Sequence, residues 1–266
     1  MLVKTNAIVL SKLKYRDNDL IVKCYTEELG VVSFLLRGVL KSKKGGGAKI
    51  AYFQLLSQLH ITVNYKDSRS LQSLSEVRLN HLYSSLHTNV LKSAIVMFLS
   101  EVLSSALREE EQNETLFRYL ETALLWLDEQ SDYANFHLLF LLNLTKYLGF
   151  YPDSLDRELD HFNLIEGKFQ VRQDIRNTIA GEDLNLLKKL LETTFNDLQN
   201  VKINGRQRQS FLNMILLYFE LHLGGSFKTP KSLKFLIKFL VKHEVFLHYI
   251  FRSIYLCKLC SKRKSA

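Results

Sequence analysis

The sequence predicts an α+β, multi-domain protein in which a small five-stranded β-barrel precedes an α-helical domain. Hydrophobic residues alternate with period two as far as about residue 80 and recur with a period near 3.6 beyond it. The formal net charge of +9 is divided unevenly, with +7 over residues 1–80 and −7 over residues 81–180. With 47% hydrophobic residues, 2 prolines and 11 glycines in 266 residues, the composition is that of a globular protein. The change of period and of charge at one place predicts a domain boundary near residue 80.

Five segments of the first domain, residues 1–80, have the alternation and the β-branched and aromatic residues that strands favour. They are residues 4–15, 20–26, 31–39, 50–65 and 69–79. Five antiparallel strands leave two unpaired edges unless the sheet closes on itself, so we expect an OB-fold barrel. The open face and the loops of such barrels commonly bind single-stranded nucleic acid.

The second domain, residues 81–237, is expected to be α-helical. Helices are predicted at residues 86–103, 114–129, 133–148, 182–195, 205–223 and from residue 230 onward. The segment 136–144 is apolar on nearly every side, which predicts the central buried helix. An irregular segment at residues 150–181 contains a predicted hairpin, formed by residues 162–165 and 168–171. Residues 238–266 are a basic extension of unknown role.

The barrel carries 13 Lys and Arg residues against 6 Asp and Glu residues, which favours a polyanionic partner. Each cation that replaces a condensed counterion on a phosphate gains the entropy of ion release. The residues predicted to contact nucleic acid are Lys12, Lys14, Tyr15, Arg16, Lys23, Arg37, Lys41, Lys43, Lys44 and Lys49. Tyr25 and Tyr52 are further candidates for base stacking. The alternative is a solvated basic loop beside core aromatic residues.

No motif supports catalysis, a metal or a cofactor. Cys257 and Cys260 form a lone CxxC pair, whereas a tetrahedral zinc site needs four ligands. His243 and His248 are five residues apart, which directs them to different sides of a helix. The sequence has no GxSxG, GxGxxG or HExxH motif. We therefore expect a protein that is not an enzyme and has no cofactor.

The location expected from the sequence is the cytoplasm. Three cysteines cannot build a disulfide framework, and the chain does not open with a secretory signal. The longest uncharged stretch, residues 50–65, is too short and too polar to cross a bilayer.

Several segments, in this order and spacing, resemble the RecO family of bacterial recombination mediators over residues 1–237. In the barrel they are TNAIVL at 5–10, KYRDND at 14–19, YTEELG at 25–30 and RGVLKSK at 37–43. In the helical domain they are LGFYPD at 148–153, LYFELHLG at 217–224 and KSL at 231–233.

The resemblance implies a DNA-binding mediator of the RecF pathway that is associated with the nucleoid. Such a protein binds single- and double-stranded DNA and anneals complementary strands. With RecR it promotes loading of RecA onto DNA coated by single-strand-binding protein. A second contact with DNA, or with the acidic tail of the single-strand-binding protein, is predicted at Arg206, Arg208, Lys231 and Lys234.

The chain departs from the family pattern at two places. Residues 150–171 contain no cysteine, so the zinc site of many RecO proteins is not expected here. Residues 238–266 go beyond the pattern, either as a last packed helix with a basic tail or as an amphipathic helix for a partner or a membrane surface. Two other functions remain open: a general OB-fold protein that binds single strands or RNA, and a scaffold that contacts only proteins.

Overall fold

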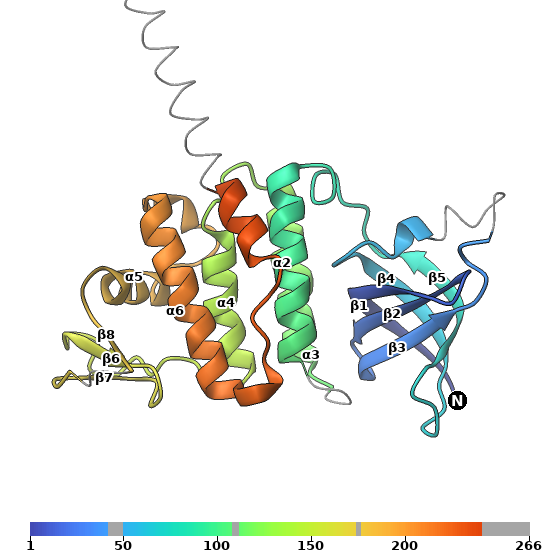
Figure 1. Cartoon of the computed structure of the whole chain (residues 1–266), viewed down its shortest axis with the longest axis horizontal. Helices are drawn as coiled ribbons and strands as arrows, with labels where there is room; N and C mark the ends of the chain where they lie inside the picture. Colours follow the sequence, from blue (N-terminus) through green and yellow to red (C-terminus); the bar gives the residue numbers. More distant parts are fainter. Residues whose placement is uncertain (42–49, 108–111, 174–176, 241–266) are drawn as a thin grey trace, which may run out of the picture.

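The computed structural model describes residues 1–41, 50–107, 112–173 and 177–240 of the chain. An antiparallel sheet forms its N-terminal part, and helices follow, which confirms the predicted α+β class (Figure 1). The strands of the sheet are β1 (Leu2–Tyr15), β2 (Asp19–Thr26), β3 (Gly30–Leu36), β4 (Gln58–Asn64) and β5 (Ser73–Leu79).

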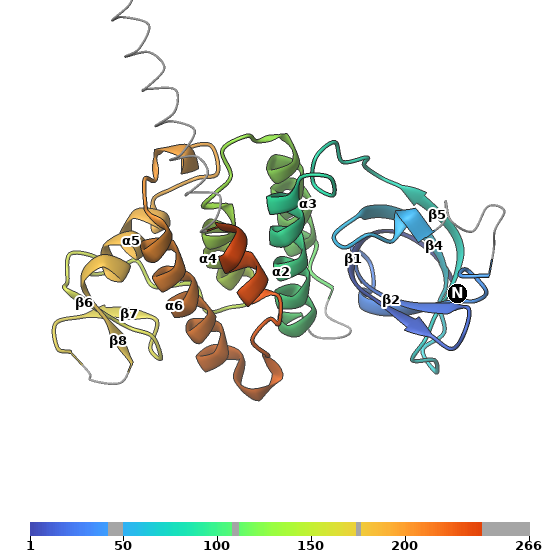
Figure 2. The same cartoon turned by 45° about the horizontal axis from the view of Figure 1, so that its top comes forward.

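The five-stranded sheet curls into a barrel of the OB type (Figure 2). The strand order is β3-β2-β1-β4-β5, so β3 and β5 are its edges. Gln72, just before β5, joins the two edges: its N–H donates to Ser33 O at 2.9 Å, and its carbonyl accepts from Leu35 N at 3.0 Å. The only bridge between these edges within the described residues is the parallel one at Phe34 and Gln72. The barrel is therefore drawn together at one point and is not closed by a full ladder.

Neighbouring side chains of β1 enter two different hydrophobic cores. Ala7 and Val9 point into the barrel and pack with residues such as Phe34. Ile8 and Leu10 point the other way, into the core that the helices build. Tyr25, Val31 and Leu56 of the barrel belong to this second core as well. The barrel and the helices are consequently packed against each other through β1.

The prediction of a strand at residues 50–65 was wrong for the first half of this segment. Residues 50–52 are helical, and β4 begins only at Gln58. Phe53 and Leu56 are nonetheless buried, because this part of the chain turns across the barrel and covers it. A short apolar run occurs both in buried strands and in buried turns, so periodicity alone does not distinguish a strand from a turn here.

The third strand is shorter than predicted because residues 37–41 form turns. Gly38 has a φ of +65°, a conformation that favours glycine, and its N–H donates to Asp19 Oδ1 at 2.7 Å. The chain therefore leaves the sheet after Leu36.

The helical part contains five long helices among the described residues. These are α2 (Val90–Ala106), α3 (Glu114–Glu129), α4 (Phe136–Tyr147), α5 (Gly181–Leu191) and α6 (Gly205–Leu223), and residues 233–240 are also helical. Asn89, Asn113 and Asn204 accept backbone N–H bonds as N-caps of α2, α3 and α6. Nine of the twelve residues of α4 are buried, which confirms the prediction that it is the central helix.

A three-stranded sheet interrupts the helices between α4 and α5. Its strands are β6 (His161–Asn163), β7 (Lys168–Gln170) and β8 (Thr178–Ile179), in the order β7-β6-β8. The hairpin of β6 and β7 confirms the sequence prediction, and β8 is an additional strand. Tyr218 of α6 donates a hydrogen bond to Phe150 O at 2.8 Å and packs against Phe162, which attaches the small sheet to the helices.

No helix within the described part of the chain combines the length and the apolar composition needed to cross a membrane.

Candidate nucleic-acid interface

Two turns bring cations together at one end of the barrel. The turn between β1 and β2 carries Arg16, and the turn after β3 carries Arg37 and Lys41. Leu40 N donates to Asn18 O at 3.0 Å, so the two turns are hydrogen-bonded to each other. All three cations are exposed. The local hydrogen bonds of the turns thus place charges from separate parts of the sequence side by side.

The last residues of β1 add two more cations to this end. Lys12 pairs with Val22 and Lys14 pairs with Leu20, whose side chains are buried in the barrel core. Directly paired residues share a face of the sheet, so both lysines stand on the inner face, where β1 extends beyond the core. Both are exposed. The predicted candidates Lys12, Lys14, Arg16, Arg37 and Lys41 are therefore gathered at one end.

Tyr15 lies beside this cluster, on the other face of β1. It is 36% exposed, and the guanidinium carbon of Arg16 lies 5.2 Å from the centre of its ring. A cation over an aromatic ring is attracted by the ring, so Arg16 helps to hold Tyr15 in place. The partly exposed ring of Tyr15 is a candidate stacking surface beside the cations.

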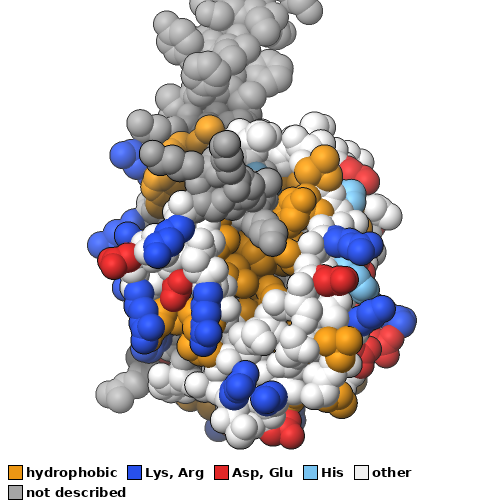
Figure 3. Space-filling model, turned by 90° about the vertical axis from the view of Figure 1, so that its right-hand side faces the viewer, with side chains coloured by type: hydrophobic (Ala, Val, Ile, Leu, Met, Phe, Trp, Pro, Cys, Tyr) orange, Lys and Arg blue, Asp and Glu red, His pale blue; other side chains and the backbone are white. Residues whose placement is uncertain are grey.

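Figure 3 views the molecule from the side on which the barrel lies. Hydrophobic side chains form the floor of a hollow near its centre, and Lys and Arg side chains outnumber Asp and Glu side chains around the rim. An apolar floor with a cationic rim suits a single strand, whose bases stack on apolar surface while its phosphates contact cations.

Four predicted residues of the barrel are not brought into this cluster. Lys23 pairs with Ser11 and Ser33 and stands on the outer face, opposite to Lys12. Lys43, Lys44 and Lys49 lie outside the described residues.

Tyr25 does not offer a stacking face, because its ring is buried against Phe117 and its hydroxyl donates to Asn113 O at 3.1 Å. Tyr52 is half-buried against the barrel core. The prediction that both rings stack on bases used only their residue type, which does not show whether a ring is buried.

The second predicted contact with DNA or a partner consists of four residues, of which the structure buries one and exposes three. Arg208 is only 5% exposed, and its Nε donates to Asn135 Oδ1 at 2.9 Å, so it supports the start of α6 from inside. Arg206, Lys231 and Lys234 are exposed. Figures 1 and 2 place α6 on the far side of α2 and α3 from the barrel. Arg206 therefore does not extend the cluster. The helical residues 233–240, red in both figures, also lie on the side of α2 away from the barrel, so Lys231 and Lys234 do not extend it either.

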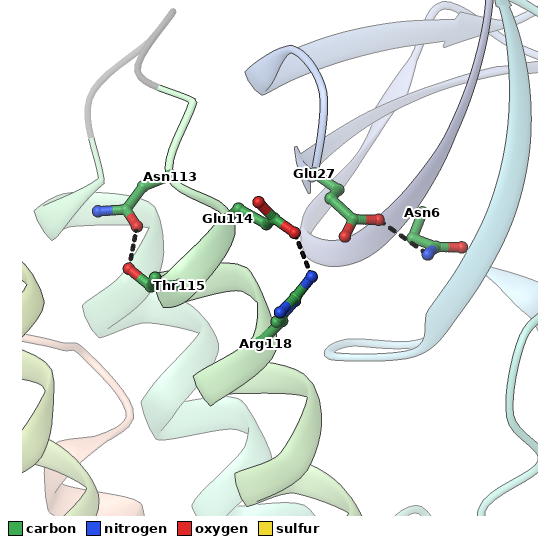
Figure 4. A network of polar contacts seen from close by, with 6 residues as sticks. All are labelled: Asn6, Glu27, Asn113, Glu114, Thr115 and Arg118. Atoms are coloured by element: carbon green, nitrogen blue, oxygen red, sulfur yellow. Dashed lines mark hydrogen bonds and ion pairs between the residues drawn. The ribbon is translucent and has the colours of Figure 1, made fainter.

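The opposite side of the barrel meets α3 through a seam with acidic groups (Figure 4). Glu27 accepts a hydrogen bond from Asn6 Nδ2 at 2.9 Å, and Arg118 pairs with Glu114 within α3. Gln58 Nε2 donates to the backbone oxygen of Glu121 at 3.0 Å. Burial, and then the charge of Glu27, raises the pKa of the Glu121 carboxyl. Phosphates are repelled from the line where Glu27 meets the acidic residues of α3, so a strand is expected on parts of the barrel that point away from α3.

The outward face of β1, β4 and β5 carries polar residues that the sequence analysis did not select. Lys4, His60, Thr62, Glu76 and Arg78 line a depression of about 100 Å³. The alternation of polar with apolar residues in these three strands was the feature of the sequence from which this polar face could have been predicted.

Among the described residues, no three His, Cys, Asp or Glu side chains are grouped closely enough to hold a metal ion.

Two family models match the chain. The model "Recombination protein O N terminal" matches residues 1–83, and "Recombination protein O C terminal" matches residues 87–231. The chain belongs to the RecO family. This confirms the resemblance seen in the sequence.

Curated RecO relatives are similar over nearly their whole length. A protein of Christiangramia forsetii is 49% identical over 236 residues, which cover 89% of this chain and 98% of the relative. A protein of Flavobacterium johnsoniae is 44% identical with the same coverage. A protein of Bacteroides fragilis is 37% identical over 237 residues, which cover 88% of this chain and 97% of the relative. Each is named DNA repair protein RecO.

The matches of the two RecO models leave residues 84–86 between them. The backbone N–H groups of Ser84, Ser85 and Leu86 all donate to the carboxylate of Asp128 on α3, at 2.7–2.8 Å. Lys92 Nζ donates to Asp128 O at 2.8 Å. The connection between the two matched parts is thereby fixed to the helices.

Proposed function

We propose that this RecO-family protein takes part in DNA repair by recombination, and that it binds a DNA strand at the barrel end without catalysing a covalent step. The family supports the repair role, since its curated relatives are named DNA repair proteins. The observation that supports the binding site is the group of five exposed cations, Lys12, Lys14, Arg16, Arg37 and Lys41, on the two turns and the protruding end of β1.

The same contacts favour annealing of complementary strands. Phosphate contacts hold a strand in place but carry little sequence information. A strand held by its backbone keeps base edges available for a complement, and neutralised phosphates lower the repulsion between two strands. We therefore propose that the protein binds single- and double-stranded DNA and anneals strands coated by single-strand-binding protein. Its proposed partners are RecR and the acidic tail of that coating protein, and RecA loading is the step that follows.

The binding site is tested by replacing Lys12 and Lys14 with alanine. Each phosphate contact to a single strand contributes about −0.7 to the slope of log affinity against log salt concentration. About six contacts give a slope near −4, and K12A/K14A is expected to reduce its magnitude by about 1.4. Fluorescence anisotropy of a labelled 30-nucleotide strand at several salt concentrations measures both slopes.

The matched control is Lys66→Ala. Lys66 is exposed and lies near the N-terminus, at the other end of β1 from Lys14, because Tyr65 and Met1 are hydrogen-bonded. K66A is expected to keep the wild-type slope. A wild-type affinity that does not change with salt would reject DNA binding and favour a scaffold that contacts only proteins.

Annealing is measured with complementary strands that carry a donor and an acceptor fluorophore and are coated by single-strand-binding protein. We expect the wild-type chain to accelerate pairing and K12A/K14A to lose most of this acceleration. Equal affinity for RNA together with no annealing would instead identify a general single-strand-binding protein.

A further inference from the structure

The outward face of β1, β4 and β5 presents two rows of polar side chains across three strands. In one row Lys4 of β1 pairs with Thr62 of β4, which pairs with Glu76 of β5. In the next row Asn6, His60 and Arg78 are paired in the same way. The side chains of Val63, Ile61 and Leu59 alternate with them and fill the barrel core. The register of the sheet therefore fixes these polar groups on the outward face, where Lys4, His60, Glu76 and Arg78 are exposed and Thr62 between them is buried.

The depression on this face is lined by two cations and a ring that is held in position. Asn6 Nδ2 donates to Glu27 Oε2 at 2.9 Å, which directs Asn6 Oδ1 to His60 Nδ1 at 3.1 Å. An amide oxygen only accepts, so Nδ1 is the protonated nitrogen of this contact. Lys4 and Arg78 stand on neighbouring strands around the ring. Two cations and an imidazole that line one depression are suited to one nucleotide, with its phosphate on the cations and its base on the ring.

Glu76 is the one carboxylate that lines the depression, and the carboxylate of Glu27 beside it is hydrogen-bonded to Asn6. Its Oε2 is 4.0 Å from Arg78 Nη2, and both side chains are more than half exposed. An exposed pair at this distance holds its partner weakly, so a phosphate can replace the carboxylate on Arg78. Glu76 therefore lowers the affinity of this face for an anion without closing it.

This face is separate from the cluster at the barrel end. Lys4 and Lys12 belong to the same strand, but the register of β1 against β2 shifts between Val9 and Ser11. This bulge reverses the alternation, so Lys4 is on the outer face and Lys12 on the inner face. Eight residues of a strand span about 26 Å. We propose that the outward face of β1, β4 and β5 binds a phosphodiester segment of a second DNA strand while the barrel end holds the first. The proposal rests on the proposed function. It implies that one protein molecule holds both of the strands that are annealed.

Sedimentation velocity of the full chain with an excess of hexathymidylate at low salt tests the proposal. It reports the protein's oligomeric state together with the number of strands that move with it. We expect two hexamers on each wild-type chain and one on K4A/R78A. The charge-matched control K66A/R69A removes two exposed cations of the β4–β5 turn and is expected to bind two. E76Q is expected to bind the second hexamer about threefold more tightly.

The outcomes separate this inference from the proposed function. If wild type binds no hexamer, the proposed function fails. If wild type binds one, or if K4A/R78A still binds two, DNA binding stands and the second site is overturned. Circular dichroism of each variant verifies that it is folded.

Discussion

His137 is a histidine inside an otherwise apolar helix. It is fully buried in α4, and neither ring nitrogen has a hydrogen-bond partner among the described residues. The ring of Phe98 lies edge-on to it at 6.5 Å. Burial, and then the charge of Arg208, lowers its pKa to about 3. The folded protein therefore keeps this imidazole neutral under conditions where an exposed histidine is charged.

This histidine predicts a loss of stability in mild acid. The folded-state pKa is below the unfolded value near 6.5, so the unfolded chain takes up the proton first and folding becomes less favourable as the pH falls below about 6.5. Between pH 7 and pH 5 the free energy of unfolding should fall by about 2 kcal/mol from this group alone. Urea unfolding of wild type and His137→Leu at both pH values measures the difference. The leucine variant should lose about 2 kcal/mol less, and an equal loss in both proteins would contradict the prediction.

Asp128 shows the opposite case, a buried carboxylate that is fully hydrogen-bonded. Burial alone raises its pKa, but hydrogen bonds from the backbone of Ser84, Ser85 and Leu86 and from the Ser84 side chain lower it to about 2. Its contribution to stability is present above the unfolded pKa near 4 and is lost as the pH falls toward 2.

Asp128→Ala is expected to destabilise the protein by about 3 kcal/mol at pH 7, because three backbone donors and Lys92 lose their acceptor or its support. Chemical denaturation with urea gives this value. Asp132→Ala is the control, since Asp132 is exposed and its nearest cation, Lys202, is 4.0 Å away. Its cost should remain within about 0.5 kcal/mol. Equal effects of the two substitutions would show that the contacts of Asp128 contribute little.

At the scale of elements, the hairpin of β6 and β7 depends on one glycine. Gly167 has a φ of +66°, and an added Cβ would lie 2.8 Å from the Tyr218 hydroxyl oxygen. That hydroxyl donates to Phe150 O after α4, and the Tyr218 ring packs against Phe162 of β6, so the side chain cannot move without disturbing the contacts that hold the small sheet on α6. The turn and the attachment thus require the same small residue.

Gly167→Ala should therefore cost about 3 kcal/mol, from backbone strain together with the displaced tyrosine. Gly149→Ala separates the two causes, since Gly149 also has a positive φ but has no atom within 4 Å of an added Cβ. It should cost about 1 kcal/mol. Thermal unfolding followed by circular dichroism compares them. Equal destabilisation by the two substitutions would mean that Tyr218 moves aside without loss of stability.

Periodicity predicted the long elements well and the turns poorly. The helices Glu114–Glu129 and Gly205–Leu223 have the predicted ends, because asparagine caps precede them and polar or glycine residues follow. The strand expected at residues 50–65 was half wrong, since buried turns and strands share an apolar pattern. The strand β8 was missed because two residues carry no period.

The candidate interface was predictable in charge but not in geometry. Composition marked the barrel as basic, whereas the hydrogen bond between the two turns selected which cations stand together. Lys12 and Lys23 look alike in the sequence and are on opposite faces only because of the strand register. The burial of Arg208 had no signal, since its acceptor, Asn135, is 73 residues away.

At the scale of the whole molecule, the barrel and the helices share a core. Tyr25 and Gln58 of the barrel donate hydrogen bonds to backbone oxygens of Asn113 and Glu121. Ile8 and Leu10 are buried in the same cluster as the helices. The predicted domain boundary near residue 80 therefore divides the sequence at a point where packing is continuous.

This predicts that both parts unfold in one transition. Trp126 on α3 is the only tryptophan and reports on the helices. Cys24 is buried in the barrel and becomes the only thiol once Cys257 and Cys260 are replaced by serine. Tryptophan fluorescence and thiol labelling should give the same urea midpoint. Thiol labelling at a urea concentration where the fluorescence is still native would show that the barrel opens by itself.

The first strand has a consequence for how the protein tolerates sequence change. Inserting or deleting one residue between Ala7 and Leu10 would send each side chain to the wrong interior, so that stretch has a rigid length. From Lys12 onward the same strand projects past both interiors and ends in solvent at Tyr15. The side chains of Lys12, Lys14 and Tyr15 are exposed, so their charge can change without altering either interior, and the affinity for a polyanion can be adjusted on an unchanged scaffold.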